Sequence, residues 1–533
     1  MNMHGPKTLR RALLPIALVA LARPALADEP AKPSPRDCAR LLHPDEAHGA
    51  FEPAQRVGEA RAYEPGARMD LGDCMRIDVP ASLAGRLENV SRFPVDRYGN
   101  GIGGASASPE LRLGARFTSG LRWAPFVLGA ELEVDALTGV AARTPAIAGD
   151  GFPGGQGLDL QLRKAYARLS VGRWAHLSVG AQTSHFGMGL VSNDGAHGWT
   201  PGSARFDDPR GGDRVLRAQL ATGPGPDLGL LLALGADHVL ADDFMLSGDT
   251  ADQLFGALLF GAGKPVSGGF SIARRHQTNA AGRATDVTIV DLTAKAATRA
   301  DGVGVGLETE WAVIAGETGL GATVEHPTSK VLQVGGAARA SIEAGALGAV
   351  IDFLYASGDQ NPYDGKQNAF RADPNFSFGL LLFRQVMAAQ SARGVGTASD
   401  PQLVGIATDA ERLATRGGAT NTVALFPKLL VRPTAGVEAY GGPLVAFANV
   451  PHTDVFNTEV GGGAPRGPLG APAGQSLGLE VDVGVRMRTI LYGTELTLGL
   501  EGGAFAPSDA MRALDGTTMG TVWGGRALLR YRL

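Results

Sequence analysis

The most constraining feature of the sequence is a period-two alternation of apolar and polar residues in its C-terminal part, residues 478–533. Between residues 478 and 489, one parity holds apolar residues and the other mostly charged ones: Leu479, Val481, Val483, Val485 and Met487 against Glu480, Asp482, Arg486 and Arg488. The same pattern returns at 494–501 and at 526–533. It predicts β-strands with one apolar and one polar face. In a soluble sheet the apolar face covers a core, whereas in a transmembrane barrel it meets lipid and the charged face lines a wet lumen.

The rest of the chain decides between these settings, because its connections alternate in length. Long connections are predicted at 94–109, 138–157, 185–212, 240–252, 279–284, 318–329, 357–420, 449–477 and 504–520, with connections of two to six residues between them. Long outer loops and short periplasmic turns are typical of outer-membrane barrels. The sequence therefore predicts an all-β, transmembrane antiparallel β-barrel of about 18 strands, with long extracellular loops and short periplasmic turns.

The N-terminal part is expected to be an export signal followed by an extension. Lys7, Arg10 and Arg11 precede an apolar run and an Ala-Leu-Ala cleavage site, so residues 1–27 read as a signal peptide. We interpret 28–73 as a periplasmic extension or a plug segment, and 74–533 as the barrel. Because an exported chain can oxidise one cysteine pair, Cys38 and Cys74 are predicted to form a disulfide.

Residues 357–420 are interpreted as one long extracellular or in-folding loop. Counting 377–389 as a further strand would give an odd number of strands, whereas bacterial single-chain barrels have even numbers. Leu380, Phe383 and Met387 also fit helical spacing. We therefore predict a short helix here, folded over or into the mouth of the barrel.

Charged residues on the polar parity are the predicted lumen or constriction set. This set comprises Arg112, Arg116, Arg217, Glu308, Glu310, Arg486, Arg488, Glu495, Arg530 and Arg532. The two signs roughly balance among all lumen-facing positions, and many are expected to pair across neighbouring strands, Glu495 and Glu501 with Arg530 or Arg532 among them. Selectivity for anions therefore does not follow from the charge count.

The sequence indicates no catalytic site, metal site or cofactor. Ser184 and His185 are adjacent on a strand, so their side chains point to opposite faces and cannot form a dyad. Oxygen ligands at Asp359, Asn361, Asp364 and Asp373 could hold calcium, but their spacing is not that of an EF-hand, and a solvated polar loop is the simpler interpretation. A net charge of −4 gives no basic footprint for nucleic acid. We expect a monomer whose partner is outer-membrane lipid.

Three stretches resemble alginate-export-type outer-membrane barrels and related porin-like proteins. They are 164–169 (KAYARL) with 179–182 (VGAQ) and 185–190 (HFGMGL), then 355–359 (YASGD), then 373–375 with 381–383. Ala181 stands where that family usually has arginine, and Phe186 where it usually has tryptophan. The resemblance implies an 18-stranded barrel that passes a polyanionic polysaccharide.

Together these features predict a channel in the outer membrane of a Gram-negative bacterium. Its cargo would be polar or charged solutes, or an exported polysaccharide, diffusing through a charged lumen. The expected gate is 357–420, with the N-terminal segment as a further candidate. One alternative is a non-conducting surface barrel whose loops bind a partner. Another is an outer-membrane hydrolase, which would need a Ser, a His and an acid brought together at one loop cluster.

Overall fold

The computed structural model describes residues 67–70, 75–79, 81–123, 126–138, 158–171, 174–194, 212–225, 227–261, 264–398, 409–434, 436–491 and 494–532. The predicted signal peptide, most of the predicted extension and both cysteines lie outside these residues.

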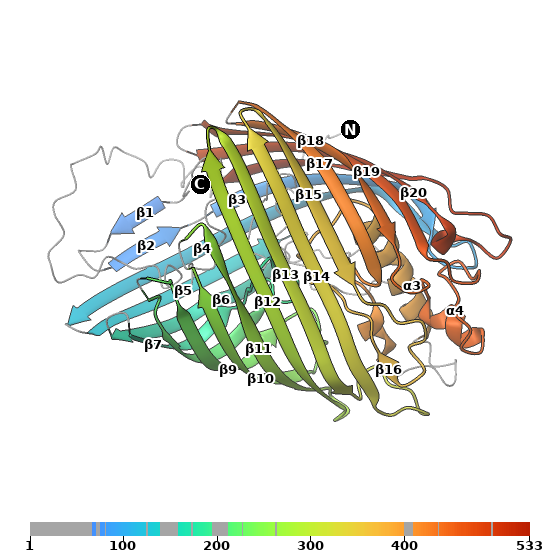
Figure 1. The fold of residues 1–533 in the computed structure, drawn as a ribbon, viewed down its shortest axis with the longest axis horizontal. Coiled ribbons are helices and arrows are strands. Elements are labelled where there is room, and N and C mark those ends of the chain that lie inside the picture. The colour runs from blue at the N-terminus through green and yellow to red at the C-terminus, as the bar shows by residue number, and fades with distance from the viewer. Residues whose placement is uncertain are drawn as a thin grey trace, which may run out of the picture.

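The wall of the molecule is a closed ring of antiparallel strands (Figure 1). Eighteen of the described strands form it: β3 (Ala81–Pro94), β4 (Gly101–Trp123), β5 (Phe126–Thr138), β6 (Leu158–Val171), β7 (Ala175–Thr183), β8 (Arg214–Thr222), β9 (Leu231–Ala241), β10 (Thr250–Phe260), β11 (Val266–Thr278), β12 (Ala284–Ala300), β13 (Val303–Thr318), β14 (Ser329–Ala344), β15 (Leu347–Ala356), β17 (Thr422–Thr434), β18 (Val437–Phe447), β19 (Ser476–Leu491), β20 (Thr494–Pro507) and β21 (Val522–Arg532). Each pairs with its neighbours in chain order, and β21 pairs with β3 to close the ring. The predicted all-β antiparallel barrel is confirmed.

Three short strands extend the wall at its two ends. β1 (Ala67–Asp70) and β2 (Met75–Val79) form a hairpin that pairs with the far part of β4, beyond the end of β3. β16 (Lys366–Gln367) pairs with the start of β14. In Figure 1, β1 and β2 lie at one end of the barrel, and β16 lies at the other end with the helices.

The strand prediction was wrong at one connection. Residues 94–109 were predicted to be a long loop, but β4 begins at Gly101 and pairs with β3 from there. The period-two pattern is hidden in this part because 101–108 contains only small residues and one Ile. A loop of six residues therefore joins β3 to β4.

β6 contains a β-bulge. Glu133 of β5 pairs with Lys164, and the next residue, Val134, pairs with Leu162, so Arg163 is the extra residue. The extra residue shifts the pairing by one position, so the side chains after it change parity. Leu160 and Leu162 before it and Leu169 after it are therefore all exposed on the outer face.

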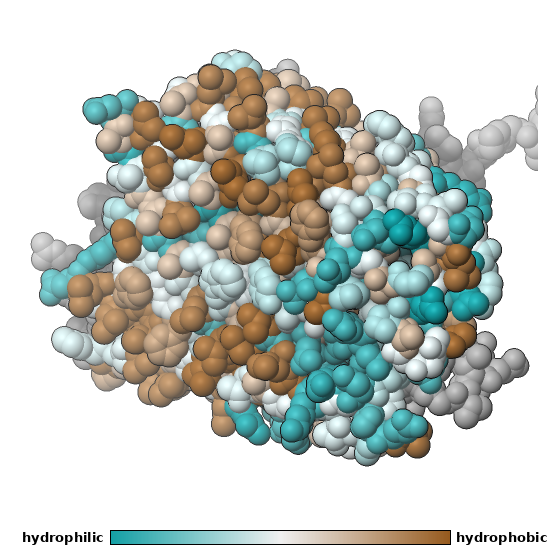
Figure 2. Space-filling model, turned by 45° about the vertical axis from the view of Figure 1, so that its right-hand side comes forward, coloured by the Kyte–Doolittle hydropathy of each residue, from teal (hydrophilic) through white to brown (hydrophobic). Residues whose placement is uncertain are grey.

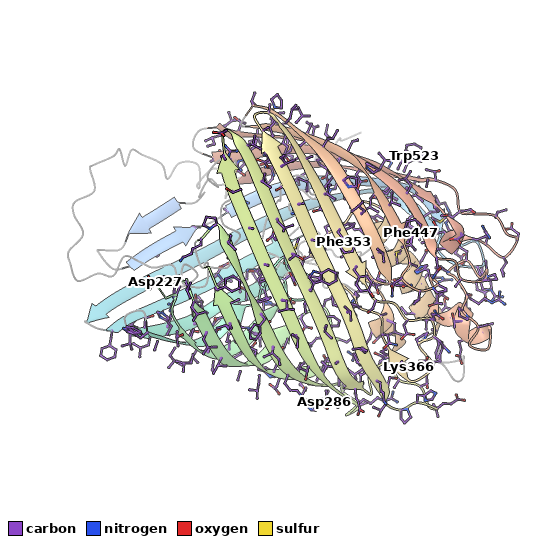
Figure 3. The ribbon with its side chains drawn as sticks, in the orientation of Figure 1. Asp227, Asp286, Phe353, Lys366, Phe447 and Trp523 are labelled. Carbon is purple, nitrogen blue, oxygen red and sulfur yellow. The ribbon has the colours of Figure 1, made fainter. Side chains whose placement is uncertain are left out.

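The outer face of the wall is apolar and the inner face is polar. In β19, Leu479, Val481 and Val483 are all exposed, whereas the alternate residues Glu480 and Asp482 are fully buried. Figure 2 shows apolar side chains spread over the wall and hydrophilic ones gathered towards one end. In Figure 3, Asp227 lies at one end of the barrel and Lys366 at the other, with Phe353 on the wall between them.

Helices occur only in the connections, among the described residues. A π-helical turn, η1 (Leu382–Met387), continues into α3 (Ala388–Ala398), and α4 (Val455–Val460) and the 3₁₀ turns η2 (Ala410–Leu413) and η3 (Asp509–Met511) are short. β15 pairs directly with β17, so 377–389 is not part of the wall and the predicted helix is present, although it runs further, to Ala398. None of the described helices is both long and apolar enough to cross a bilayer.

Candidate functional site in the barrel lumen

Two connections enter the lumen. The inner loop, residues 184–194, follows β7, and the strap, residues 357–398 and 409–421, leaves the wall between β15 and β17. The apolar core of the molecule lies between these segments and the inner face of the wall. Among its fully buried members are Leu190 of the inner loop, Leu382 and Met387 of the strap, and Phe426 and Phe505 of the wall. The lumen is thus partly filled with packed side chains.

A buried carboxylate of β19 holds the start of the strap helix. Glu480 accepts hydrogen bonds from three consecutive backbone N–H groups, those of Leu380 (2.6 Å), Leu381 (2.8 Å) and Leu382 (2.7 Å). Asp482, two residues along the same strand, also accepts from Leu380 N–H, at 3.1 Å. These donors have no partner within the helix, and a carboxylate is the acceptor that the positive end of a helix favours. We call these contacts the seat.

The seat has room for leucines because two glycines that face the strap lie opposite each other in the wall. They are Gly503 of β20 and Gly524 of β21. A Cβ atom at Gly503 would lie 3.4 Å from Leu381 Cδ1 and 3.5 Å from Leu380 Cδ2. The missing side chains therefore form a shallow recess that the start of the helix fills.

From the seat, the strap helix runs along β3. Gln385 donates to Glu88 (2.9 Å), Gln390 donates to the carbonyl of Pro94 (3.2 Å), and Arg393 pairs with Asp96 (2.8 Å). Burial acts to raise the pKa of Asp96, but hydrogen bonds from Asn100 and Arg393 outweigh it and lower that pKa. The carboxyl therefore stays ionised as a partner for Arg393.

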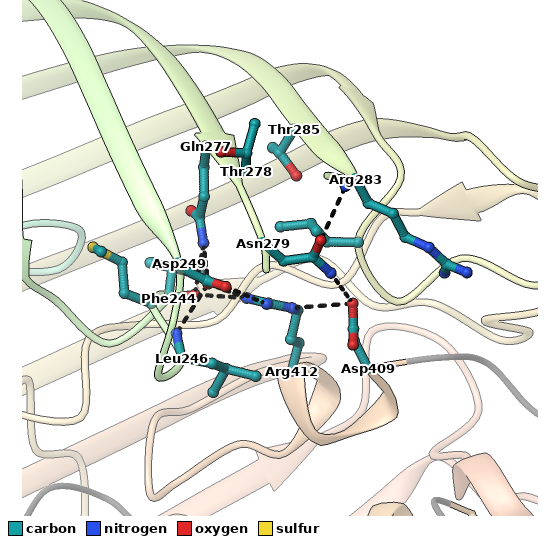
Figure 4. Close-up of polar contacts among 12 residues, drawn as sticks. Phe244, Leu246, Asp249, Gln277, Thr278, Asn279, Arg283, Thr285, Asp409 and Arg412 are labelled. Atoms are coloured by element: carbon teal, nitrogen blue, oxygen red, sulfur yellow. Dashed lines mark hydrogen bonds and ion pairs between the residues drawn. The ribbon is translucent and has the colours of Figure 1, made fainter. Parts of the chain in front are cut away.

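Arginines of the strap bind the loop between β9 and β10. Arg412 donates two hydrogen bonds to Asp249 (2.7 and 2.8 Å), and Arg371 pairs with Asp243 (2.7 Å). Arg416 donates to the backbone carbonyl of Asp243 at 2.8 Å. Although burial raises the pKa of Asp249, its hydrogen bond from Arg412 leads the effects that lower it. We call these contacts the latch; Figure 4 shows Arg412 with Asp249.

A second polar contact supports the latch from β11. Asn279 donates to Asp409 of the strap at 2.6 Å, and Gln277 donates to Asp249 at 2.8 Å. Figure 4 places both contacts around Arg412. The strap is therefore bonded to the loop and, through Asn279, to the turn that follows β11.

The seat and the latch lie on opposite sides of the barrel. In the ring of eighteen strands, β20 is nine positions from β10, which is half of the circumference. The strap therefore crosses the whole lumen near the end that carries the long connections.

The inner loop is held in the same way as the strap helix. Glu310 of β13 is fully buried and accepts from the backbone N–H groups of Met188 and of Leu190 (3.1 Å). Arg163, at the β6 bulge, donates to the carbonyl of Asp194 at 2.9 Å. The inner loop thus reaches from β7 to β13 and narrows the lumen at the middle of the wall.

The predicted lumen residues do not gather into one ring. Arg488 (3.0 Å) and Arg530 (3.7 Å) both pair with Glu495, as the alternation predicted for Glu495 and Arg530, and Arg532 lies opposite Glu495 in the strand register. Glu501, by contrast, pairs with Arg526 rather than with Arg530 or Arg532. This cluster lies at the short-turn end.

The other predicted lumen residues are spread around the wall. Arg217 binds Asp237 through two hydrogen bonds, of 2.7 and 2.8 Å. Glu308 lies opposite Arg339 and Arg486 opposite Glu438 in the strand register. The side chains of Arg112 and Arg116 lie outside the described part of β4.

The sequence did not single out the residues of the latch. Arg412 and Asp249 are 163 positions apart, and only the closed ring brings their loops together. The seat left a weak signal, since the glycine pairs 502–503 and 524–525 interrupt two strands that otherwise alternate cleanly.

The structure gives little support to a calcium site around Asp359 or to a catalytic pair at Ser184 and His185. Asp359 accepts from the backbone N–H groups of Asn361 and Asn368 (both 2.9 Å), as in a polar turn. Across the described ranges, no three His, Cys, Asp or Glu residues are placed to hold a metal ion. Ser184 shares hydrogen bonds with Ser192 and Arg217, and no bond joins it to His185.

No protein-family model and no curated protein sequence matches the chain. Solved structures do: OccK9 (OpdG) of Pseudomonas aeruginosa is 12% identical, with a TM-score of 0.49, and the match covers 86% of this chain and 98% of that one. OccAB1 of Acinetobacter baumannii is 10% identical, at a TM-score of 0.48 and a coverage of 89% and 99%. OccK2 (OpdF) of Pseudomonas aeruginosa in complex with glucuronate is 11% identical, at 0.47 and 86% and 98%. At these identities and TM-scores the likeness identifies no substrate; the barrel itself rests on the strand pairing described above.

Proposed function

We propose that the protein is an outer-membrane channel of a Gram-negative bacterium that passes small polar or charged solutes by diffusion. One observation carries this proposal: the closed ring presents its apolar side chains outward and its charged side chains inward. Water would not favour so large an apolar exterior, because a soluble monomer rarely exposes more than a few hundred Å² of contiguous apolar surface. A bilayer favours it, and a closed barrel leaves no strand edge unpaired in lipid.

Aromatic side chains on the outer face support the membrane setting. Trp523 and Tyr531 are both exposed at opposite ends of β21, and Phe447 is exposed at the long-connection end of β18. The eight residue-to-residue steps from Trp523 to Tyr531 span about 27 Å of strand. A tilt of about 40° reduces this to roughly 20 Å, close to the apolar band of about 25 Å in outer-membrane barrels.

The filled part of the lumen favours small solutes over a polysaccharide chain. The strap crosses the full diameter and the inner loop reaches β13, so a solute has to pass beside both. A polysaccharide, which the resemblance to alginate-export-type barrels implies, would need a wider continuous passage. We therefore place it second among the cargoes.

A non-conducting barrel is the second candidate function, and the apolar core inside the lumen favours it. Leu382, Phe383 and Met387 are packed against the wall and are buried as completely as side chains in a protein interior. If this packing closes the passage, the long connections would serve only to bind a partner. We propose a monomeric barrel. The proposed function involves no enzymatic activity and no cofactor.

Conductance in planar bilayers tests the proposal. The mature protein, purified in detergent, is expected to give discrete single-channel steps. Deleting 377–398 from the strap should raise the step size, because this part packs across the lumen. A barrel that folds but stays closed in both forms would support the non-conducting alternative. Liposome swelling with sugars of increasing size then separates small solutes from polysaccharide.

A further inference from the structure

The two anchors of the strap differ in what they bind. At the seat, the backbone N–H groups of residues 380–382 donate to side chains of a wall strand, Glu480 and Asp482 of β19. The leucine side chains lie over glycines of β20 and β21. Wall strands are paired on both sides along their length, so these partners cannot move alone. The start of the strap helix is therefore fixed to the rigid part of the barrel.

At the latch, the main partners belong to a loop. Asp243 and Asp249 lie in the eight-residue connection between β9 and β10, which is outside the wall. Their bonds to the strap are made by side chains and single carbonyls, and not by strand pairing. Connections held by few buried apolar contacts open more easily than paired strands.

The chemistry of the anchors differs as well. The seat joins backbone N–H groups to a carboxylate within an apolar core. The latch joins arginine side chains to aspartates, with Arg371 also stacked over the ring of Phe244 at 4.9 Å. Losing one arginine removes a set of latch bonds and leaves the seat intact.

We propose that the strap pivots on its seat and releases at its latch, so that parting of Arg412 from Asp249 opens the passage on the side of β9 and β10. The effect on conduction rests on the proposed channel function. The pivot itself does not, since it is a property of the folded chain.

Hydrogen exchange followed by mass spectrometry tests the pivot without needing conduction. In Arg412→Gln, amides of 410–418 and 242–249 are expected to exchange about tenfold faster than in the natural chain. Amides of 380–387 should change less than about twofold, because the seat holds them. Arg432→Gln is the matched control: Arg432 also makes two ion pairs, to Glu343 and Glu438, but both of these partners belong to wall strands.

The pivot is overturned if 380–387 exchanges faster to the same extent as 410–418, which would mean that the strap moves as one body. It is equally overturned if neither segment responds. Asp249→Asn removes the ion pair between Arg412 and Asp249 from the loop side and replaces Arg412→Gln if that variant does not fold. Single-channel recording of the same variants is the second arm. Faster exchange with no current in any variant would leave the pivot standing and defeat the channel.

Discussion

Leu381 of the strap lies directly over Gly524 of β21, so closely that a Cβ atom added at residue 524 would lie 2.5 Å from Leu381 Cδ2. Real Cβ contacts are not that short, so Gly524→Ala has to displace the leucine or the strand. We expect the substitution to destabilise the barrel by about 1–3 kcal/mol, which is the usual cost of overpacking. Urea-induced unfolding in detergent measures it. Gly520→Ala, where nothing lies within 4 Å, is the control and should be neutral.

The same pair gives a coupling test. Leu381→Ala alone should destabilise by about 2–5 kcal/mol through the cavity it leaves. In the double variant, the new methyl group at residue 524 fills part of that cavity, so the two effects should not add. Strictly additive effects would show that Leu381 does not sit over Gly524.

Glu480→Gln tests the seat through its charge. One amide oxygen can still accept a hydrogen bond, but the amide nitrogen then faces the N–H group of Leu382 and cannot accept from it. Because one buried donor loses its partner, we expect a loss of about 1–3 kcal/mol and faster exchange of amides 380–387. Glu495→Gln is the control, since Glu495 is also buried but binds the side chains of Arg488, Arg530 and Thr497 within the wall. Unchanged protection of 380–387 in Glu480→Gln would contradict the seat.

Two outward-facing leucines, one on β20 and one on β19, test whether lipid covers the outer face of the wall. Leu500 is exposed near the middle of the strand, and Leu491 is exposed at the short-turn end of β19. An arginine facing lipid costs about 2–4 kcal/mol at the bilayer midplane and about 0–1 kcal/mol near the interface. Leu500→Arg should therefore impair folding into vesicles far more than Leu491→Arg. Equal yields of folded barrel would mean that hydrocarbon does not cover residue 500.

The wall could be predicted from the sequence because its signal is local. Alternation at Leu479 and Glu480 depends only on which face each residue presents, and even the register shift at Arg163 is visible as a change of parity. The start of β4 was missed where small residues carry no hydropathy contrast, from Gly101 onwards. A local pattern thus gives faces and approximate strand positions.

The lumen could not be predicted in the same way. Which side chains meet inside a barrel depends on the closure of the ring, since Glu480 binds residues about 100 positions away. The parity of Glu310 indicates that it points inward, but not that it holds Leu190. The parity of Glu480 and Glu310 therefore indicated the face of each residue but not the backbone groups that it binds.

A buried triad in the wall allows two costs to be measured separately. One is the cost of removing a buried charge, and the other is the cost of leaving buried charges without their counterion. Asp352 binds both Arg339 (2.5 Å) and Lys428 (2.5 Å). Lys428→Met leaves one balanced pair and replaces a stem of similar shape, so we expect a cost below about 1.5 kcal/mol. Asp352→Asn leaves two buried cations without their counterion and should cost about 3–5 kcal/mol. Unfolding midpoints of the two variants in detergent measure the difference, and equal midpoints would contradict this account.

Two groups in the connection between β18 and β19 are expected to make the stability of this connection depend on pH in opposite directions. Burial raises the pKa of Asp454 to about 7, although it accepts a hydrogen bond from Asn457 N–H, and burial lowers the pKa of His452 to about 4. The folded chain therefore holds a proton on Asp454 more tightly than the unfolded chain does. The contribution of Asp454 to stability is therefore present at low pH and is lost as the pH rises from about 4 to about 7. His452 resists protonation, so its contribution is present at neutral pH and is lost as the pH falls from about 6.5 to about 4.

In the natural chain these two slopes oppose each other, and single substitutions should separate them. Asp454→Asn keeps an N-cap for α4 and removes one titration, so protection of the α4 amides, corrected for intrinsic exchange rates, should rise from pH 4 to 6.5. In His452→Gln, Asp454 is the one of the two groups that still titrates, and protection should fall over pH 4 to 7. If both variants change in the same direction with pH, then at least one of the two groups does not have the shifted pKa, and the connection is held by contacts that do not titrate.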